Sequence, residues 1–390
     1  MEKISNQTFN IKLTVVTPTF IGAGGDKDWK SGVDYIQKDG KIYVFDIEKM
    51  ATLHIFSEDQ LAELFVKGGQ KVADVLSPKI ESDFGNLERA LRYQPFDSPV
   101  DKSDEIKSVI RSQFHDVPLI PGSSLKGAIR SVLFKYLYKK AEQEDRAKAD
   151  GKKDEERKKK NETDVFGKLK NGGDFMRFIQ IGDVEMTTPN ESGNITVILN
   201  TKIFNLQNNE KSWRGGWKHA FTHTDKYFKA KGFNTLYECV APGTSGSLVI
   251  ALKQNAIGLL PPKDFILCKE AKESLLRNIT VLFGIINEHT KVYLEKELDF
   301  FKKYNEADRT SEIIKNIEEL IQRIPSDNSS CLLKMAAGSG FHSITGDWYD
   351  DYDATGFNSK TGKKKYKSRK IVEYNDKLSL MGFVELKAEG

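Results

Sequence analysis

The sequence predicts an α+β protein, because segments typical of strands alternate with amphipathic helices along the chain. Near the N-terminus, residues 10–15 alternate polar and apolar side chains, as a half-buried strand does. Asp39-Gly40 then joins the β-type segments 34–36 and 42–45, and this dipeptide favours the positive φ values of a tight hairpin turn. Residues 125–137 place apolar side chains at helical spacing, which predicts a helix with one buried face.

The second half of the chain repeats this mixture of strands and helices. Strand-like composition marks five segments there: 178–181, 195–199, 236–240, 247–250 and 378–386. The third and fourth of these are joined by the Pro- and Gly-containing residues 241–246, which predicts a second hairpin. Apolar side chains recur at helical spacing over 275–286 and again over 313–321, so we expect an antiparallel helix pair.

A highly charged segment divides the two halves. Of the 22 residues over 139–160, 17 are Lys, Arg, Asp or Glu, so this segment cannot build a core. We therefore predict domains over 1–138 and 164–390, joined by a charged linker over 139–163, with a helical insertion in the second domain at about 269–325. A strand-helix-strand-strand-helix-strand unit accounts for each half. The predicted fold is thus two ferredoxin-like (RRM-like) domains with helical and loop insertions, in which one sheet face is left for a partner.

Composition excludes several classes of protein. With 60 basic and 56 acidic residues the net charge is only +4, so total charge does not identify a nucleic-acid-binding protein. The three cysteines, Cys239, Cys268 and Cys331, are too far apart for a disulfide framework or a zinc site, which favours a reducing cytoplasm. The sequence has neither a signal peptide nor a run of about 18 apolar residues. We expect a cytoplasmic protein without membrane contact, metal or cofactor.

The most specific local feature is Ile-Pro-Gly-Ser-Ser-Leu-Lys-Gly-Ala-Ile-Arg, residues 120–130, a small-residue turn that leads into a helix. Free backbone N–H groups at a helix start favour anions, and Ser123 or Ser124 can cap the helix. Lys126 and Arg130 lie one turn apart and share a face, so together these groups could bind an RNA phosphate. The alternative is an ordinary capped helix with two solvated bases.

This segment resembles the central motif of the RAMP superfamily of CRISPR proteins. Weaker resemblances to the same family follow in order along the chain: 17–22, 34–46, 166–167, 181–183, 237–244 and 338–340. Within the family, length and motif order are most similar to the subunit that caps the end of the type III-A (Csm) effector complex. The resemblance implies ferredoxin-like folds that bind guide RNA (crRNA) through glycine-rich loops and nearby basic residues.

The resemblance also implies partners and a role in antiviral defence. The expected partners are crRNA, the backbone RAMP subunit and the small helical subunit of the Csm complex, and host ribonucleases that complete crRNA 3′ end maturation. The implied subunit is not an enzyme. The RNA-binding residues expected from the motifs and their neighbours are Gly22, Gly24, Gly25, Gly122, Ser123, Ser124, Lys126, Arg130, Arg214, Lys218, Gly338, Gly340 and His342.

Arg214 and Lys218 enter this set because they alternate with tryptophans. Trp213 and Trp217 offer π faces and the two bases offer charge, which together favour RNA stacking and phosphate contact. A surface loop with partly buried tryptophans is the alternative. His219 and His223 lie nearby, four residues apart, as metal ligands on one helix face can be. No nearby Cys or Glu completes such a site, and Gly215-Gly216 argues against a regular helix there.

An endoribonuclease acting on crRNA precursor or target RNA is the alternative function. In the backbone subunits that the resemblance points to, an Asp near the position of Asp34 cleaves target RNA with a divalent metal. Asp34 could equally serve as a turn residue at the start of a strand. His342, in the late glycine-rich loop, could act as a general acid or base. The basic segment 360–370, which contains Tyr366, is either an RNA-binding arm or a solvated surface.

Overall fold

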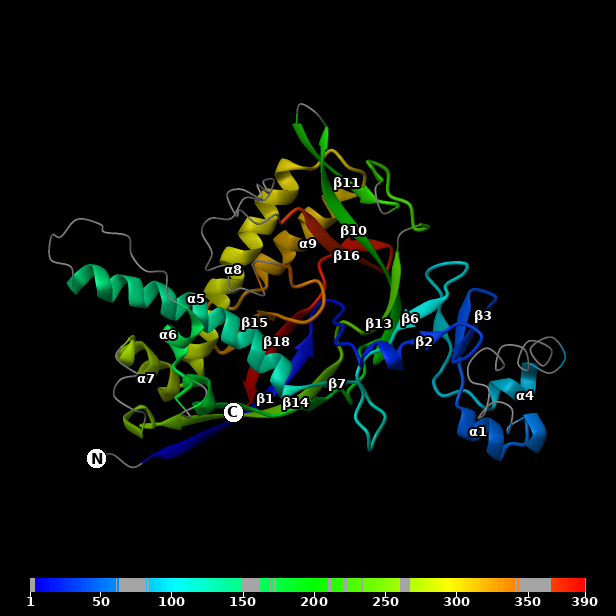
Figure 1. Ribbon diagram of the computed structural model, residues 1–390, viewed down its shortest axis with the longest axis horizontal. Coiled ribbons are helices and arrows are strands. Elements are labelled where there is room, and N and C mark those ends of the chain that lie inside the picture. The colour runs from blue at the N-terminus through cyan, green and yellow to red at the C-terminus, as the bar shows by residue number, and fades with distance from the viewer. Residues whose placement is uncertain are drawn as a thin grey trace.

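Two β-sheets share one layer of helices in the computed structural model of the protein (Figure 1). The structure describes residues 4–60, 62, 82, 84–148, 161–168, 170, 173–209, 212–220, 223–232, 234–259, 267–340, 343 and 366–389. Within these residues, none of the helices is long and apolar enough to cross a membrane.

The first sheet has five antiparallel strands and draws on both ends of the chain. Its order is β15 (Ser330–Lys334), β18 (Phe383–Glu389), β1 (Ser5–Val15), β14 (Ser245–Gln254) and β8 (Ile179–Ile181). In register, Ile11 faces Leu248 and Leu13 faces Leu386, and all four side chains are buried. The N-terminal strand therefore lies between two strands from the second half (Figure 1).

Three helices cover one face of this sheet. They are α5 (Gly122–Lys148), α7 (Lys269–Arg277) and α8 (Ile279–Lys303). Helix α5 contributes the apolar positions predicted from its spacing, with Leu125, Ile129 and Leu133 fully buried against the sheet. The opposite face of the sheet carries exposed side chains such as Lys12 and Ser247, so it is open to solvent.

The second sheet is built around the 14-residue strand β10 (Thr196–Asn209). Its other members are β11 (Ser212–Lys218), β12 (Thr224–Asp225), β13 (Thr235–Val240), β6 (Glu105–Lys107), β2 (Trp29–Lys30), β16 (Ser368–Tyr374) and β17 (Lys377–Ser379). Thr201 pairs with both β13 and β16, and Phe204 pairs with both β11 and β16. Strands β11 and β13 therefore follow one another along the same edge of β10, and β16 occupies the opposite edge.

Helices α8 and α9 (Thr310–Gln322) pack on the second sheet. Their core is aromatic, with Phe204 of β10 in contact with Phe300, Phe301 and Trp217. Helix α8 thus contributes to the cores of both sheets. The expected antiparallel helix pair corresponds to α8 and α9, whereas the segment 275–286 spans a break at Asn278, whose side chain accepts the Thr280 N–H and starts α8.

A small module extends from the second sheet on the right of Figure 1. It contains β3 (Tyr35–Lys38), β4 (Lys41–Val44), β5 (Phe96–Asp97), α1 (Ile47–Thr52) and α4 (Phe84–Glu88). The hairpin predicted at Asp39-Gly40 is confirmed, because Lys38 pairs with Lys41 and both turn residues have positive φ, 51° and 72°. The remaining short elements are β7 (Leu119–Ile120), β9 (Val184–Glu185), α6 (Glu162–Phe166), and 3-10 turns at Gly25–Lys27, Phe175–Phe178 and Ile257–Leu259.

Two expectations about chain organisation are wrong. Residues 236–240 and 247–250 do not form a hairpin, because β13 pairs with β10 and β6 whereas β14 pairs with β1 and β8. Val15 holds the crossover between the sheets by donating to Thr244 O and accepting from Gly243 N. Turn composition indicates where a chain bends but not which partner the next strand finds.

The linker expected over 139–163 is partly helical, since α5 continues to Lys148 and Asn161 caps α6. A boundary there does not separate two independent sheets, because β1 pairs only with strands from beyond it. The structure is α+β, as predicted, but the division into domains 1–138 and 164–390 is not how the sheets are arranged. The helical insertion expected at about 269–325 matches the bounds of α7 to α9, although these helices belong to the shared core.

Candidate RNA interface

The signature segment 120–130 forms the junction of β7 and α5, and Gly122 is its most constrained residue. A Cβ at Gly122 would lie 2.3 Å from Ile181 O and 2.7 Å from Gly182 O, so only glycine fits here. The Gly122 N–H donates to Asp183 Oδ1 at 2.7 Å. The carboxylate of Asp183, and not Ser123 or Ser124, therefore occupies the N-terminus of α5, where anions are favoured. The two serines lie exposed and half-buried beside it.

Lys126 and Arg130 share a face of α5 as expected, but only one of them is left for a ligand. Arg130 Nη1 makes two contacts with Asp174, at 3.1 and 2.8 Å, and Arg130 also reaches Glu162 Oε2 at 3.2 Å. Its guanidinium lies 4.2 Å from the centre of the Phe166 ring. Arg130 is thus a brace between α5 and α6, and this geometry does not support it as a phosphate ligand. Lys126 is half-buried, and partial burial lowers the pKa of its ammonium group against the opposing effect of Asp174.

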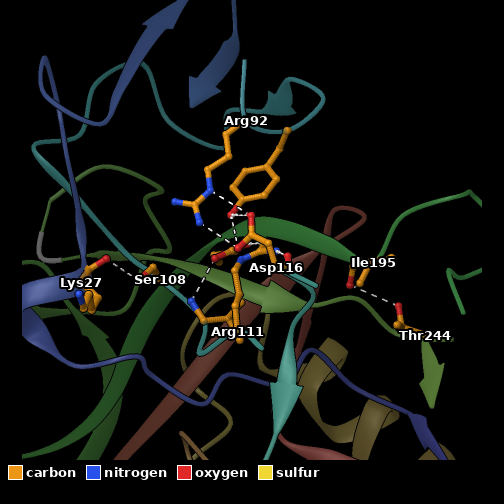
Figure 2. A network of polar contacts seen from close by, with 10 residues as sticks. Lys27, Arg92, Ser108, Arg111, Asp116, Ile195 and Thr244 are labelled. Carbon is orange, nitrogen blue, oxygen red and sulfur yellow. Dashed lines mark hydrogen bonds and ion pairs between the residues drawn. The ribbon is translucent and has the colours of Figure 1, made fainter. Parts of the chain in front are cut away.

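The glycine-rich loop at Gly22–Gly25 is hydrogen-bonded to the segment that directly follows β6. Gly24 has φ 111°, a conformation that favours glycine. Ala23 N–H donates to Ser108 O at 3.1 Å, and Ser108 Oγ donates to Lys27 O at 2.7 Å (Figure 2). Buried Asp28 binds Lys107 Nζ at 2.7 Å and the Ser108 N–H at 3.1 Å. These contacts fix the loop against residues 107–109.

Residues 111–118, here called the arm, extend from this point as a narrow antiparallel loop. Ser112 N–H donates to Val117 O at 2.8 Å, and Arg111 and Pro118 form an isolated antiparallel β-bridge. Asp116 closes the turn with φ 49°. At the tip, Phe114 is 91% exposed, the largest exposed fraction among the large apolar side chains that the structure describes. An aromatic ring held out in water is available for contact with a partner.

A buried ion pair holds the base of the arm. Glu238 of β13 is fully buried, accepts the Val109 N–H at 3.0 Å and pairs with Arg111 Nη2. Burial raises the pKa of Glu238, and the charge of Arg111 opposes this shift. The Arg111 guanidinium also lies 4.2 Å from the centre of the Tyr93 ring. Since breaking such a pair leaves a buried charge, it strongly favours one position of the arm.

Further contacts brace both sides of the arm. Asp116 accepts two hydrogen bonds from Arg92, at 3.0 and 2.9 Å, and its carbonyl accepts one from Arg111 at 2.7 Å (Figure 2). On the other side, Glu185 of β9 accepts from Ser112 Oγ at 2.5 Å and lies 2.9 Å from His115 Nδ1. The hydrogen bond from Ser112 is a main cause of the lowered pKa of Glu185. The arm is thus held in place by charges from three parts of the chain.

The late glycine-rich loop packs against the same region. Ala337 N–H donates to Phe20 O at 3.1 Å, so this loop touches the segment that continues to Gly22. Gly338 and Gly340 have φ 75° and 66°, and a Cβ at Gly340 would lie 2.0 Å from Tyr366 Oη. The structure therefore brings together the two glycine-rich loops and the base of the arm. His342 lies outside the described residues.

A buried lysine, Lys334, holds the segment that packs against the glycine-rich loop 338–340. Lys334 is almost fully buried, and its ammonium group donates to Met381 O. Burial lowers the pKa of Lys334 to about 7. Met381 Cγ lies 2.6 Å from where a Cβ of Gly338 would be, so Lys334 fixes the segment on which the glycine loop rests.

Comparison with protein-family models identifies the family of the chain. A family model described as the RAMP superfamily matches residues 12–332. The chain belongs to the RAMP superfamily. No curated protein matches the sequence.

Two solved structures resemble this RAMP protein over nearly its whole length. One is a chain of a Csm–crRNA–target RNA ternary complex from a type III-A CRISPR-Cas system, with 18% identity, a TM-score of 0.62, and coverage of 98% of this chain and 100% of that chain. The other is Csm5 from T. onnurineus, with 16% identity, a TM-score of 0.59, and coverage of 96% and 99%. At these identities the similarity shows the fold.

Arg214 and Lys218 lie apart from the arm in this RAMP fold, on strand β11. Trp217 is fully buried between Phe204 and Phe228 and donates from Nε1 to Asp308 O at 2.8 Å. It is therefore not a stacking platform, and the expectation for Trp217 is wrong. Phe204 and Asp308, which contact it, are distant in sequence, so the local pattern gave no signal.

Strand β11 ends at Lys218, directly before His219, and this decides the geometry of the two histidines. His219 N–H donates to His223 O at 3.0 Å, so the pair does not share a helical face. The glycines of β11 are explained by close contacts, since a Cβ at Gly215 would lie 2.3 Å from Phe204 and one at Gly216 would lie 2.7 Å from Asp225 O. Among the described residues, no group of His, Cys, Asp and Glu is arranged to hold a metal ion.

Asp34, the candidate for metal-dependent cleavage, stabilises a turn. Its Oδ2 accepts the Lys30 N–H at 2.8 Å, and its carbonyl accepts the Phe45 N–H at 3.0 Å. The turn interpretation of Asp34 accounts for both contacts.

The basic segment 360–370 is only partly described, from residue 366 onwards. Arg369 is buried and pairs with buried Glu297 at 2.9 and 3.2 Å. The guanidinium lies 3.4 Å from the centre of the Phe300 ring and 3.8 Å from that of Tyr366. Tyr366 and Arg369 are thus part of the core, and the interpretation of these two residues as an RNA-binding arm is wrong.

Phe114 was missed by reasoning from the sequence. It follows Ser112-Gln113 and precedes His115-Asp116, so it is an isolated aromatic residue within a polar turn. That pattern is a usable signal, because an apolar side chain among turn residues has no local reason to be buried.

Proposed function

We propose that this RAMP protein binds crRNA as a non-catalytic subunit at the end of a type III-A (Csm) effector complex. The observation that carries the proposal is the braced arm with Phe114 at its tip, beside two glycine-rich loops. Similarity to a chain of a Csm–crRNA–target RNA complex and to Csm5 supports the choice of complex. All three cysteines are free and buried, which supports action in a reducing cytoplasm.

The residues present suit single-stranded RNA. An exposed aromatic ring stacks on any base, and half-exposed Lys126 supplies a positive charge for a phosphate. Gly25, where a Cβ would meet no atom closer than 4.0 Å, leaves room for a nucleic-acid backbone to approach the polypeptide, whereas the Cβ positions of Gly338 and Gly340 are filled by Met381 and Tyr366. None of these groups reads base edges, so we expect weak sequence preference.

The partners proposed with crRNA are the backbone RAMP subunit, the small helical subunit of the complex and host ribonucleases that trim the crRNA 3′ end. The open face of the first sheet, with exposed Lys12, Ser247 and Val249, supports a protein contact there. The assignment to crRNA 3′ end maturation rests on the family resemblance.

The test is equilibrium binding of the full-length protein to a fluorescent single-stranded RNA across a salt series, with denaturing gels in parallel. Phe114→Ala removes the ring and should weaken binding by about 1–3 kcal/mol, the usual contribution of one stacked base. Lys126→Ala should reduce the slope of log K against log salt by about 0.7, the value for one phosphate contact to a single strand.

Two exposed residues away from the arm provide matched controls. Leu53→Ala removes an exposed apolar side chain in the small module, and Lys291→Ala removes an exposed charge on α8. Both should bind RNA as the wild type does. If the wild type binds RNA and both Phe114→Ala and Lys126→Ala bind it equally well, this site is wrong. Cleaved RNA on the gels would contradict the non-catalytic role.

A further inference from the structure

A second aromatic and basic surface lies beyond strand β12, on the loop 226–232. Buried groups hold the backbone of this loop from one side. Lys202 of β10 is almost fully buried, and its ammonium group donates to Lys231 O at 3.2 Å and to Gly232 O. Asn200 Nδ2 donates to Ala230 O at 3.1 Å. Burial lowers the pKa of Lys202 to about 8, which shows that desolvation of its ammonium group is unfavourable. The hydrogen bonds from this buried group hold the backbone of the loop in place.

Asp308, between α8 and α9, holds the same loop from the other side. Its N–H donates to Lys226 O at 2.8 Å, and its carboxylate accepts the Phe228 N–H at 3.3 Å. His219 Nε2 lies 2.9 Å from Tyr227 O. With carbonyls fixed at both ends, the loop loses little conformational entropy when its side chains bind a partner.

Lys226, Tyr227 and Lys229 of this loop are exposed and place an aromatic ring among cations, whereas Phe228 packs against Trp217. Tyr227 is 55% exposed, and Lys226 Nζ lies 4.7 Å from the centre of its ring. Lys229 and, on neighbouring β11, Arg214 have side chains that are 62% and 60% exposed. Their acidic neighbours Asp225 and Glu306 lie 3.8 Å away. Solvent-accessible ion pairs at that distance contribute little to stability. Lys229 and Arg214 can therefore each leave the carboxylate and bind a phosphate instead.

Strand β13 connects this surface to the arm. The loop 226–232 precedes the start of β13 at Thr235, and Glu238 of the same strand braces the arm. The second surface and the base of the arm are therefore linked by one strand of six residues, which spans roughly 20 Å at about 3.3 Å per residue.

We infer that Tyr227, Lys226, Lys229 and Arg214 form a second contact site for single-stranded RNA, with a base stacked on Tyr227 and phosphates at the three cations. This inference rests on the proposed function, because it assigns a further part of the same RNA path. The exposed ring favours RNA over an acidic protein segment, since cations alone satisfy carboxylates whereas bases also use the ring.

The experiment measures binding of fluorescent oligouridylate to the full-length protein and to variants of this loop. Tyr227→Ala should weaken binding about 5- to 150-fold, the range for loss of one stacked base, whereas Tyr227→Phe keeps the ring and should bind as the wild type does. Lys226→Glu with Lys229→Glu should reduce the salt slope by about 1.4, the value for two phosphate contacts. Lys291→Glu with Lys315→Glu makes the same change of charge at exposed positions of α8 and α9 and should leave the slope unchanged.

The outcomes separate this inference from the proposed function. Binding that falls in Phe114→Ala but not in Tyr227→Ala or the Lys226/Lys229 variant overturns the second site and leaves the proposed function standing. Absence of RNA binding by the wild type overturns both. If the Lys226/Lys229 variant loses binding to poly-L-glutamate while Tyr227→Ala binds oligouridylate normally, the surface serves an acidic protein and the inference is wrong.

Discussion

Single residues of the signature segment are fixed by distant backbone and not by local conformation. Gly122 has no unusual φ, yet its Cβ position is filled by the carbonyls of Ile181 and Gly182. Gly127, five residues later on the same helix, has nothing within 4 Å of its Cβ position. Two glycines of one motif therefore have different physical roles.

This difference predicts opposite effects of the same substitution. Gly122→Ala forces a Cβ against backbone carbonyls and should destabilise the protein by about 1–3 kcal/mol, the usual cost of overpacking. Gly127→Ala removes a flexible residue from an exposed helix position and should stabilise it by about 0.5–1 kcal/mol. Urea unfolding of both variants checks this, and equal effects of the two substitutions would contradict it.

At the scale of elements, the arm is a short loop whose position depends on charges outside it. Its braces come from Glu238 on β13, Glu185 on β9 and Arg92 between α4 and β5. We expect the pair of Glu238 to contribute most to holding the arm, because Glu238 is fully buried while the Arg92–Asp116 pair is half-exposed. Desolvated pairs are costly to break and exposed pairs are not.

Removing one partner of the buried pair should therefore release the arm. Glu238→Ala leaves Arg111 uncompensated and the Val109 N–H without its acceptor, and should cost about 3–5 kcal/mol. Hydrogen exchange should become faster over residues 109–118. Arg92→Ala, the control at the exposed pair, should cost at most about 1 kcal/mol and leave exchange there nearly unchanged. Slow exchange in the Glu238 variant would show that other contacts hold the arm.

At the scale of the whole molecule, the two halves of the chain fold around a common core. Strand β1 lies between β14 and β18, and α8 contacts both sheets. The N-terminal half therefore lacks the hydrogen-bonding partners of its own first strand.

A fragment comprising residues 1–138 should consequently not fold alone. We expect it to be degraded by limited proteolysis and to show no cooperative unfolding by circular dichroism. Co-expression of residues 1–148 with 161–390 should instead yield a complex that purifies together, because β1 then regains both partners. Cooperative unfolding of the 1–138 fragment would restore the two-domain arrangement that the sequence suggested.

Features that depend on neighbouring residues could be predicted from the sequence. The α+β class, the Asp39-Gly40 hairpin, the start of a helix near Gly122 and the family resemblance all follow from local composition, because φ preferences and helical spacing act over a few residues. The candidate glycine loops at Gly22–Gly25 and Gly338–Gly340 were also found this way, and the structure places them together.

Which of these side chains are exposed and which are paired depends on long-range packing, which the sequence did not reveal. Arg130 meets Asp174 across 44 residues, and Arg111 meets Glu238 across 127. Strands β13 and β14 go to different sheets although only the four residues 241–244 separate them in sequence. The same long-range packing buries Trp217 and leaves Phe114 in solvent. Such contacts depend on partners that chain closure brings together, and a local pattern carries no information about them.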